Sequence, residues 1–107
     1  MDIDQPRTAP AFVRMVNTEQ RTLVVDLFAP WCGPCLAMAP ALKVFARMHP
    51  ELRFAQINID ELPGVARAYQ VQAIPALLLF QNGKPVLRHR GPLNTAQLEA
   101  LIRPFTP

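Results

Sequence analysis

Cysteine is scarce in this chain, and so are charged residues. Only two of the 107 residues are cysteines, too few for a small domain held together by several disulfides. Charged residues make up 18% of the chain and hydrophobic residues 50%, which is the composition of a globular protein and not of a disordered one. The length suits one domain with a single hydrophobic core. We therefore expect one domain spanning residues 1–107.

Long apolar runs and clustered positive charge are also missing. No apolar run approaches the roughly 20 residues that cross a bilayer, and the N-terminus lacks the basic and apolar segments of a secretory signal. We therefore expect a cytoplasmic protein with no membrane segment. The net charge of +3 comes mainly from scattered arginines, with Arg-His-Arg at 88–90 as the exception, so we expect no nucleic-acid partner. We interpret residues 88–90 as solvated charge at a sheet edge, with guidance of acidic partners as the alternative.

Helical and strand-like patterns alternate along the chain. Asn82-Gly83 predicts a hairpin turn, and Pro40 predicts a kink inside the longest helix. The alternation predicts an α/β fold, with a central mixed β-sheet of four to five strands flanked by helices on both faces. The patterns predict helices over 9–17, 32–49, 62–70 and 94–105, strands over 22–29, 53–59, 75–81 and 85–90, and a weak edge strand in 1–7.

The two cysteines lie three positions apart, just after the strand predicted over 22–29 and at the start of the next helix. At this spacing in the first turn of a helix, the two sulfurs can bond. Cys32 lies at the helix start, where unpaired N–H groups and the helix dipole lower the thiol pKa below the ~8.5 of free cysteine. Cys35, one turn deeper, is expected to be more shielded and to keep its proton longer. This asymmetry predicts that Cys32 attacks a target disulfide and that Cys35 resolves the mixed disulfide.

Other uses of the cysteines have less support. A closed zinc site wants four ligands, and the remaining candidates, His49 and His89, have no paired spacing. Neither histidine is placed as the base of a cysteine hydrolase. Two inert buried cysteines remain as the alternative. We expect thiol–disulfide exchange, with no metal and no bound cofactor.

Asp26 stands inside the apolar run of the strand predicted over 22–29. An ionised carboxylate is costly in a strand buried on both faces, so either Asp26 is solvated at an edge or it is functional. Because the helix begins just past this strand, Asp26 could lie beneath Cys35. Burial would raise its pKa and let it take the Cys35 proton during resolution and return it later.

A series of residues follows one order along the chain: Asp26, Ala-Pro-Trp-Cys-Gly-Pro-Cys at 29–35, Pro40, Asn-Ile-Asp at 58–60, the segment 74–84 with Ile74-Pro75, and Gly91. On these residues the chain resembles thioredoxins over roughly residues 8–103. The resemblance implies a thioredoxin fold and dithiol–disulfide exchange on protein substrates, with Cys32 as the nucleophile, Cys35 as the resolving thiol and Asp26 as the buried proton carrier. It also implies that electrons come from NADPH through a reductase. We expect a monomer whose partners are disulfide-containing substrate proteins and thioredoxin reductase.

The resemblance further implies a substrate-docking surface around the cysteines. Pro75 should follow a cis peptide bond and face the cysteines, leaving the backbone of Ile74 free to pair with a substrate strand. The alternatives are a strand-start proline at 75 and an ordinary core position for Trp31. Gly-Pro between the cysteines is typical of the reducing members of the family. The docking surface would consist of Trp31, Gly33, Pro34, Ile74, Pro75 and Gly91.

Five positions depart from the usual thioredoxin pattern. Leu36 stands where Lys is common, and Gln56 replaces a Lys that usually neighbours the buried Asp, which would raise the Asp26 pKa further. These departures leave the exchange chemistry in place but put the choice of partners in question. A specialised oxidoreductase with another electron donor and a binding module without turnover are therefore the alternative functions. The other departures are Phe28 for Trp, Pro30 for an acid or small polar residue, and Ala76 for Thr.

Overall fold

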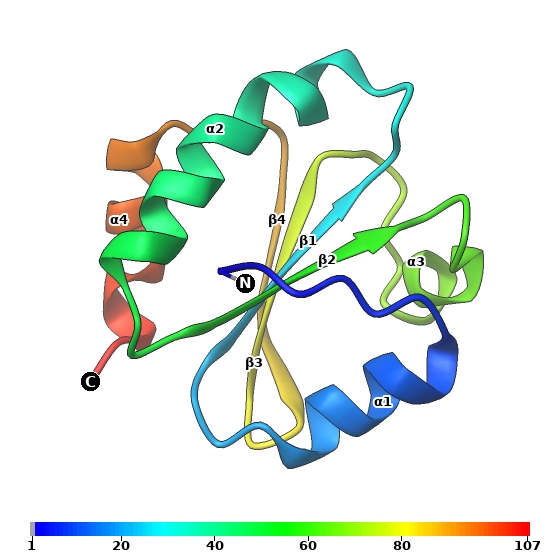
Figure 1. The fold of residues 1–107 in the computed structure, drawn as a ribbon, viewed down its shortest axis with the longest axis horizontal. Helices are drawn as coiled ribbons and strands as arrows, with labels where there is room; N and C mark the ends of the chain where they lie inside the picture. The colour runs from blue at the N-terminus through cyan, green and yellow to red at the C-terminus, as the bar shows by residue number, and fades with distance from the viewer. Residues whose placement is uncertain (1) are drawn as a thin grey trace.

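A computed structural model describes residues 2–107 as one four-stranded sheet with helices on both faces (Figure 1). The long helix and the two central strands follow the predicted ranges closely. The elements in chain order are α1 (Ala9–Thr18), β1 (Leu23–Phe28), α2 (Gly33–Met48), β2 (Arg53–Asn58), α3 (Pro63–Ala68), β3 (Ala76–Gln81), β4 (Lys84–Arg90), α4 (Thr95–Ile102) and a 3-10 turn, η1 (Arg103–Phe105).

The sheet has the strand order β2-β1-β3-β4, so β1 and β3 occupy its centre. β1 runs parallel to β2 and antiparallel to β3, and β3 is antiparallel to β4. The mixed sheet predicted from the alternation of elements is therefore confirmed. β1 and β3 lie at the centre of this sheet, and helices cover both of its faces. This burial on both faces explains why the two strands are nearly continuous in apolar residues.

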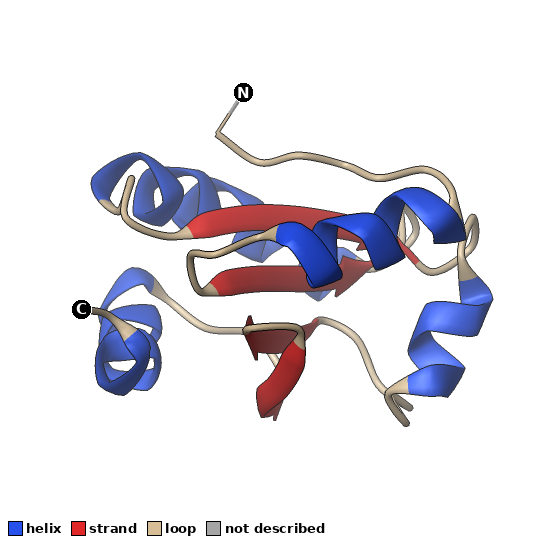
Figure 2. Cartoon of the chain, turned by 90° about the horizontal axis from the view of Figure 1, so that it is seen from below, coloured by secondary structure: helices blue, strands red, loops and turns tan. Residues whose placement is uncertain are grey.

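The helices divide into two layers (Figure 1). Val25 and Leu27 of β1 face a core that includes Phe12 of α1 and Val65 of α3. Val24 points to the opposite face, where the core includes residues of α2 and α4. Figure 2 shows the strands between these helices from below. Alternation along a single strand therefore assigns its side chains to two cores, as the pleat of a strand requires.

Local sequence signals account for several element ends. The Thr8 hydroxyl accepts a hydrogen bond from the Ala11 N–H at 3.2 Å and begins α1. Asn94 and Gln97 form a reciprocal capping box at the start of α4, so Asn94 is the cap. The Asn82-Gly83 turn joins β3 to β4 with positive φ at both residues, 52° and 80°, as a two-residue hairpin of this sequence favours.

The C-terminal helix is shorter than predicted. It is α-helical only to Ile102, and the remaining residues form the 3-10 turn η1. Pro104 has no N–H with which to continue the α-helical hydrogen bonds. In α2 the internal Pro40 leaves the helix assignment continuous, and the kink predicted there stays a prediction.

The weak edge strand predicted in residues 1–7 is reduced to one bridge between Asp4 and Ala55; Met1 lies outside the described residues. The Asp4 N–H donates to the Phe54 carbonyl at 3.0 Å, and its carbonyl accepts from the Gln56 N–H at 2.7 Å. Pro6 follows and has no N–H to extend the ladder.

Candidate active site

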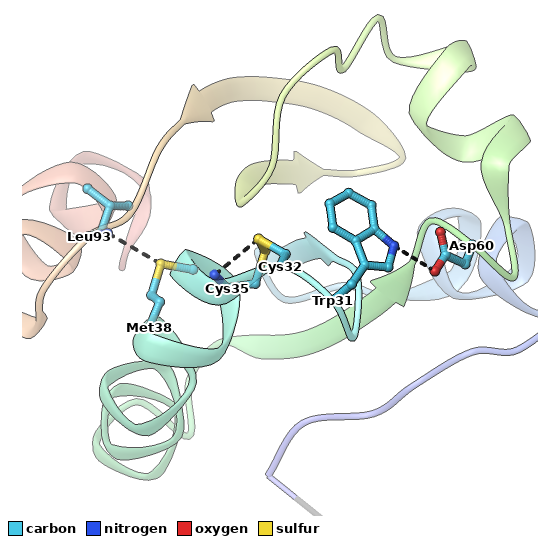
Figure 3. Close-up of a disulfide and its surroundings, with 6 residues drawn as sticks. All are labelled: Trp31, Cys32, Cys35, Met38, Asp60 and Leu93. Atoms are coloured by element: carbon cyan, nitrogen blue, oxygen red, sulfur yellow. Dashed lines mark hydrogen bonds between the residues drawn. A yellow bond between two sulfur atoms is a disulfide. The ribbon is translucent and has the colours of Figure 1, made fainter.

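The two cysteines lie where the central strand β1 gives way to α2. The Cys32 N–H donates to the carbonyl of the buried Ala29 at 3.1 Å, which turns the chain after the strand. Cys32 is the N-cap of α2, and its sulfur accepts a hydrogen bond from the Cys35 N–H at 3.2 Å (Figure 3). Pro34 occupies the first turn, where its missing N–H costs little. The sequence position of the pair therefore places one sulfur directly at a helix N-terminus.

Cys32 and Cys35 form a disulfide, with their Cα atoms 5.2 Å apart. Each residue is only 5% exposed. Cys35 is therefore no more buried than Cys32, although the sequence predicts that Cys35 is the more shielded of the two. What distinguishes them is the hydrogen bond: only the Cys32 sulfur receives a backbone N–H in this pair. A donated N–H stabilises a thiolate, so the asymmetry expected for a nucleophile is present in a different form. Within residues 2–107 no group of three or more His, Cys, Asp or Glu is arranged to hold a metal ion.

Asp26 is buried, with 4% of its surface exposed, so the alternative of a solvated edge position is wrong. Its Oδ1 atom has no hydrogen-bond partner among the residues described. Burial raises the pKa of Asp26 to about 7, and the side chain of Gln56, its neighbour in register on β2, opposes that rise without cancelling it. A carboxyl group with a pKa near neutrality can both accept and return a proton.

Strand alternation places Asp26 on the face of the sheet that α2 covers. It points to the same side as Val24, which packs in a core with Leu42 and Phe45 of α2. Cys35 belongs to the buried residues of the same helix. The carboxyl group and the second cysteine therefore lie on the same side of the sheet, as expected if Asp26 lies beneath the disulfide.

Trp31 is exposed over 69% of its surface, so the alternative of a core position is wrong. Its indole Nε1–H donates to Oδ2 of Asp60 at 3.0 Å, which fixes the ring beside the disulfide (Figure 3). Gly33 and Pro34 are exposed next to it, and Leu36 is 58% exposed. The cysteines thus lie under a mostly apolar rim.

The Ile74–Pro75 peptide bond is cis, as the family resemblance implied. Ile74 packs against the cluster formed by Ala29 and the two cysteines, so residues 39 to 45 positions apart in sequence meet here. Pro75 itself is buried, and its carbonyl accepts a hydrogen bond from the Gly91 N–H at 2.9 Å. Gly91 has a φ of 99°, a conformation that favours glycine. The structure therefore brings Ile74 to the cysteines and joins Gly91 to Pro75, while the surface of Pro75 is largely covered.

Two contacts at the site were not predicted. Asp60 accepts the hydrogen bond from Trp31, whereas the sequence indicates Asp60 only as part of the Asn-Ile-Asp match. The Met38 sulfur accepts a hydrogen bond from the Leu93 N–H at 3.3 Å, which ties the segment after β4 to α2 just beyond the cysteines (Figure 3). Met38 lies one turn after Cys35, but nothing in the sequence pairs it with Leu93. Both contacts join residues far apart in the chain.

The fold and the cysteine pair define a thiol–disulfide oxidoreductase, and comparison with known proteins identifies its family. The Thioredoxin family model matches residues 5–104. The chain is 38% identical over 100 residues to thioredoxin-1 of Saccharomyces cerevisiae, covering 94% of this chain and 95% of the yeast protein. It is 41% identical over 83 residues to a thioredoxin of Alicyclobacillus acidocaldarius, covering 77% and 79%. The chain therefore belongs to the thioredoxin family and acts by dithiol–disulfide exchange.

Solved structures agree with this assignment. The thioredoxin of Fasciola hepatica superimposes with a TM-score of 0.88 at 34% identity, covering 96% of this chain and 99% of that one. Thioredoxin NaTrxh of Nicotiana alata superimposes with a TM-score of 0.90 at 29% identity, covering 99% and 94%. The predicted thioredoxin fold is thus confirmed. In the part of the chain that the structure describes, no helix is long and apolar enough to cross a membrane.

Proposed function

We propose that the protein is a protein disulfide reductase that cycles through the Cys32–Cys35 disulfide. The observation that carries the proposal is the placement of the Cys32 sulfur at the N-terminus of α2, hydrogen-bonded to the Cys35 N–H and within bonding reach of Cys35. A helix N-terminus and a donated N–H both stabilise the thiolate, which is the attacking form.

In the reduced protein the Cys32 thiolate attacks one sulfur of a target disulfide. An S–S bond to the target forms, and the second target sulfur leaves as a thiolate that takes a proton. Cys35 then loses its proton and attacks the Cys32 sulfur, which releases the first target sulfur and closes the Cys32–Cys35 disulfide. The target gains two electrons, and the cysteine pair loses them.

Asp26 serves the second step as the acceptor of the Cys35 proton. Its position on the α2 side of the sheet and its pKa of about 7 support this role. A carboxylate with an ordinary low pKa would be a weaker base, and a carboxyl group that stays protonated could accept no proton. When the disulfide is reduced again, Asp26 returns the proton.

Target proteins dock on a rim made by the exposed Trp31, Gly33 and Pro34 and the half-buried Ile74 and Gly91. The backbone of Ile74 pairs there with an extended substrate segment. Membership of the thioredoxin family supports NADPH as the source of electrons, delivered by thioredoxin reductase. We further propose that the protein acts as a monomer in the cytoplasm.

Insulin reduction driven by dithiothreitol tests the exchange activity. A disulfide reductase precipitates the insulin B chain with turnover, whereas a binding module gives no acceleration and contradicts the proposal. Replacing dithiothreitol by NADPH and thioredoxin reductase then tests the electron donor: loss of activity at that step alone would indicate a specialised oxidoreductase with another donor.

The reduction potential of the Cys32–Cys35 pair tests the direction of the reaction. A reductase is expected to lie near thioredoxin, about −270 mV, and a value near that of a strong oxidant, about −120 mV, would contradict the proposal.

A further inference from the structure

A hollow of about 690 Å³ lies between the end of β4 and the segment that leads into the cis Ile74–Pro75 bond. Two of its lining residues carry permanent positive charge, two offer amide groups, and none is acidic. The lining residues are Gln70, Val71, Gln72, Arg88, His89 and Arg90.

The positive charge in this hollow is not neutralised by the protein itself. Among residues 2–107, neither Arg88 nor Arg90 forms an ion pair, whereas four of the other seven arginines lie within 4 Å of a carboxylate. Nη1 of Arg88 donates to the Tyr69 carbonyl at 2.8 Å and to Oε1 of Gln70 at 3.4 Å. These neutral acceptors hold the guanidinium in place without cancelling its charge. Arginine has five N–H donors, so Arg88 keeps donors for a ligand.

The hollow adjoins the active site through the backbone. Arg90 pairs in register with Ala76, the residue directly after Pro75. The next residue, Gly91, donates its N–H to the Pro75 carbonyl at 2.9 Å, and Ile74 packs against the disulfide cluster. A chain docked on Ile74 therefore reaches the hollow within a few residues.

Protection of a sheet edge accounts for exposed charge on β4. It does not account for a cavity that β4 shares with residues 70–72, nor for a guanidinium held by the Tyr69 carbonyl. A cavity with two unneutralised arginines and two side-chain amides is complementary to carboxylates, because guanidinium and carboxylate form strong charge-assisted hydrogen bonds.

We propose that this hollow selects disulfide substrates that carry an acidic segment, Asp or Glu residues in extended chain, beside the disulfide that is reduced. The inference rests on the proposed reductase function and names the class of substrate for it. The acidic segment contacts Arg88 and Arg90 while the target sulfur meets Cys32.

The test uses three synthetic peptide disulfides that differ only in flanking residues: Asp-Asp, Asn-Asn or Lys-Lys. Rate constants for their reduction by the reduced full-length protein are measured by stopped flow, following Trp31 fluorescence, at low salt and at about 0.5 M salt, where the Debye length falls to a few ångströms. Arg90→Gln and Arg90→Glu perturb the hollow. Arg14→Gln is the matched control, since Arg14 is exposed on α1 and does not line this hollow.

Wild-type protein is expected to reduce the acidic peptide roughly 3- to 10-fold faster than the neutral one at low salt, with the preference lost at high salt. Arg90→Gln should bring this ratio close to one, Arg90→Glu should invert it in favour of the Lys peptide, and Arg14→Gln should leave it unchanged. An unchanged ratio in both Arg90 variants overturns the inference, and so does an equal loss in Arg14→Gln, which would indicate net charge alone. Failure of the wild type to reduce any of the peptides would instead overturn the proposed reductase function.

Discussion

Replacement of Asp26 by Asn should make the oxidised protein more stable at alkaline pH. The substitution keeps the shape of the side chain and removes its ability to ionise. In the folded protein burial raises the pKa of Asp26 from 3.8 to about 7. Because the folded state then binds the proton more tightly than the unfolded state, ionisation of Asp26 destabilises the fold. This destabilisation is absent below about pH 4, grows as pH rises, and is complete above the folded pKa.

The size of the effect follows from the two pKa values. Each tenfold change in proton affinity corresponds to 1.36 kcal/mol, so at pH 8 the ionised carboxylate destabilises the fold by about 4 kcal/mol. At pH 5 the same relation gives a destabilisation of roughly 1.5 kcal/mol. Going from pH 5 to pH 8, the wild type should therefore lose about 2–3 kcal/mol relative to Asp26→Asn. With a urea m-value of about 1–3 kcal/mol/M, the separation between the two urea midpoints should change by about 1–3 M from pH 5 to pH 8.

Urea denaturation of the oxidised proteins at both pH values measures this difference. The comparison between pH values is more informative than either value alone, because the buried Asn amide adds its own pH-independent cost. Asp60→Asn is the matched control, since Asp60 is exposed and the side-chain oxygen of Asn can still accept the hydrogen bond from Trp31. If the difference between wild type and Asp26→Asn is the same at pH 5 and pH 8, burial does not control the ionisation of Asp26.

Three further predictions concern the exchange reaction and a second titrating group. Cys35→Ser should accumulate a stable mixed disulfide with insulin on non-reducing gels, whereas Cys32→Ser should accumulate none. Asp26→Asn should slow release from the mixed disulfide by roughly 100-fold, the lower end of the usual range for a proton-transfer group, and leave the rate of attack by Cys32 within about 2-fold; both are read by rapid-quench kinetics. His49 Nε2 lies 2.6 Å from Oε1 of Glu99, and although partial burial opposes it, this contact helps to raise the His49 pKa above 6.5. That stabilisation is full below pH 6.5 and is lost as pH rises through the folded pKa, so Glu99→Gln should cost up to about 1 kcal/mol by urea denaturation at pH 5.5 and little at pH 9.

The sequence predicts the sheet and most helices because their signals are local. The unbroken apolar run of β1 indicates burial on both faces, and five of its six residues are buried. Asn82-Gly83 specifies a hairpin turn through the backbone angles that these two residues tolerate. The site was located by the same kind of signal, a cysteine pair at the junction of a strand and a helix.

Features that depend on neighbours distant in sequence were missed or misjudged. Pairing of the N-terminal segment with β2 depends on how many backbone hydrogen bonds it can form before Pro6, which has no N–H. Only the bridge between Asp4 and Ala55 forms among the described residues. The Trp31–Asp60 hydrogen bond and the Met38–Leu93 contact each require packing that no local pattern encodes.

The pKa of Asp26 depends on contacts that the sequence alone does not reveal. The sequence contains an acid in an apolar run and a glutamine 30 positions later, and only the parallel register of β1 with β2 makes the two neighbours. An ammonium at position 56 would favour the ionised acid, whereas the Gln56 amide carries no charge and leaves Oδ1 without a partner. Burial therefore outweighs hydrogen bonding in setting the pKa near 7. The departure at Gln56 thus brings the acid closer to the proton affinity that transfer from Cys35 requires, at the cost of stability whenever Asp26 is ionised.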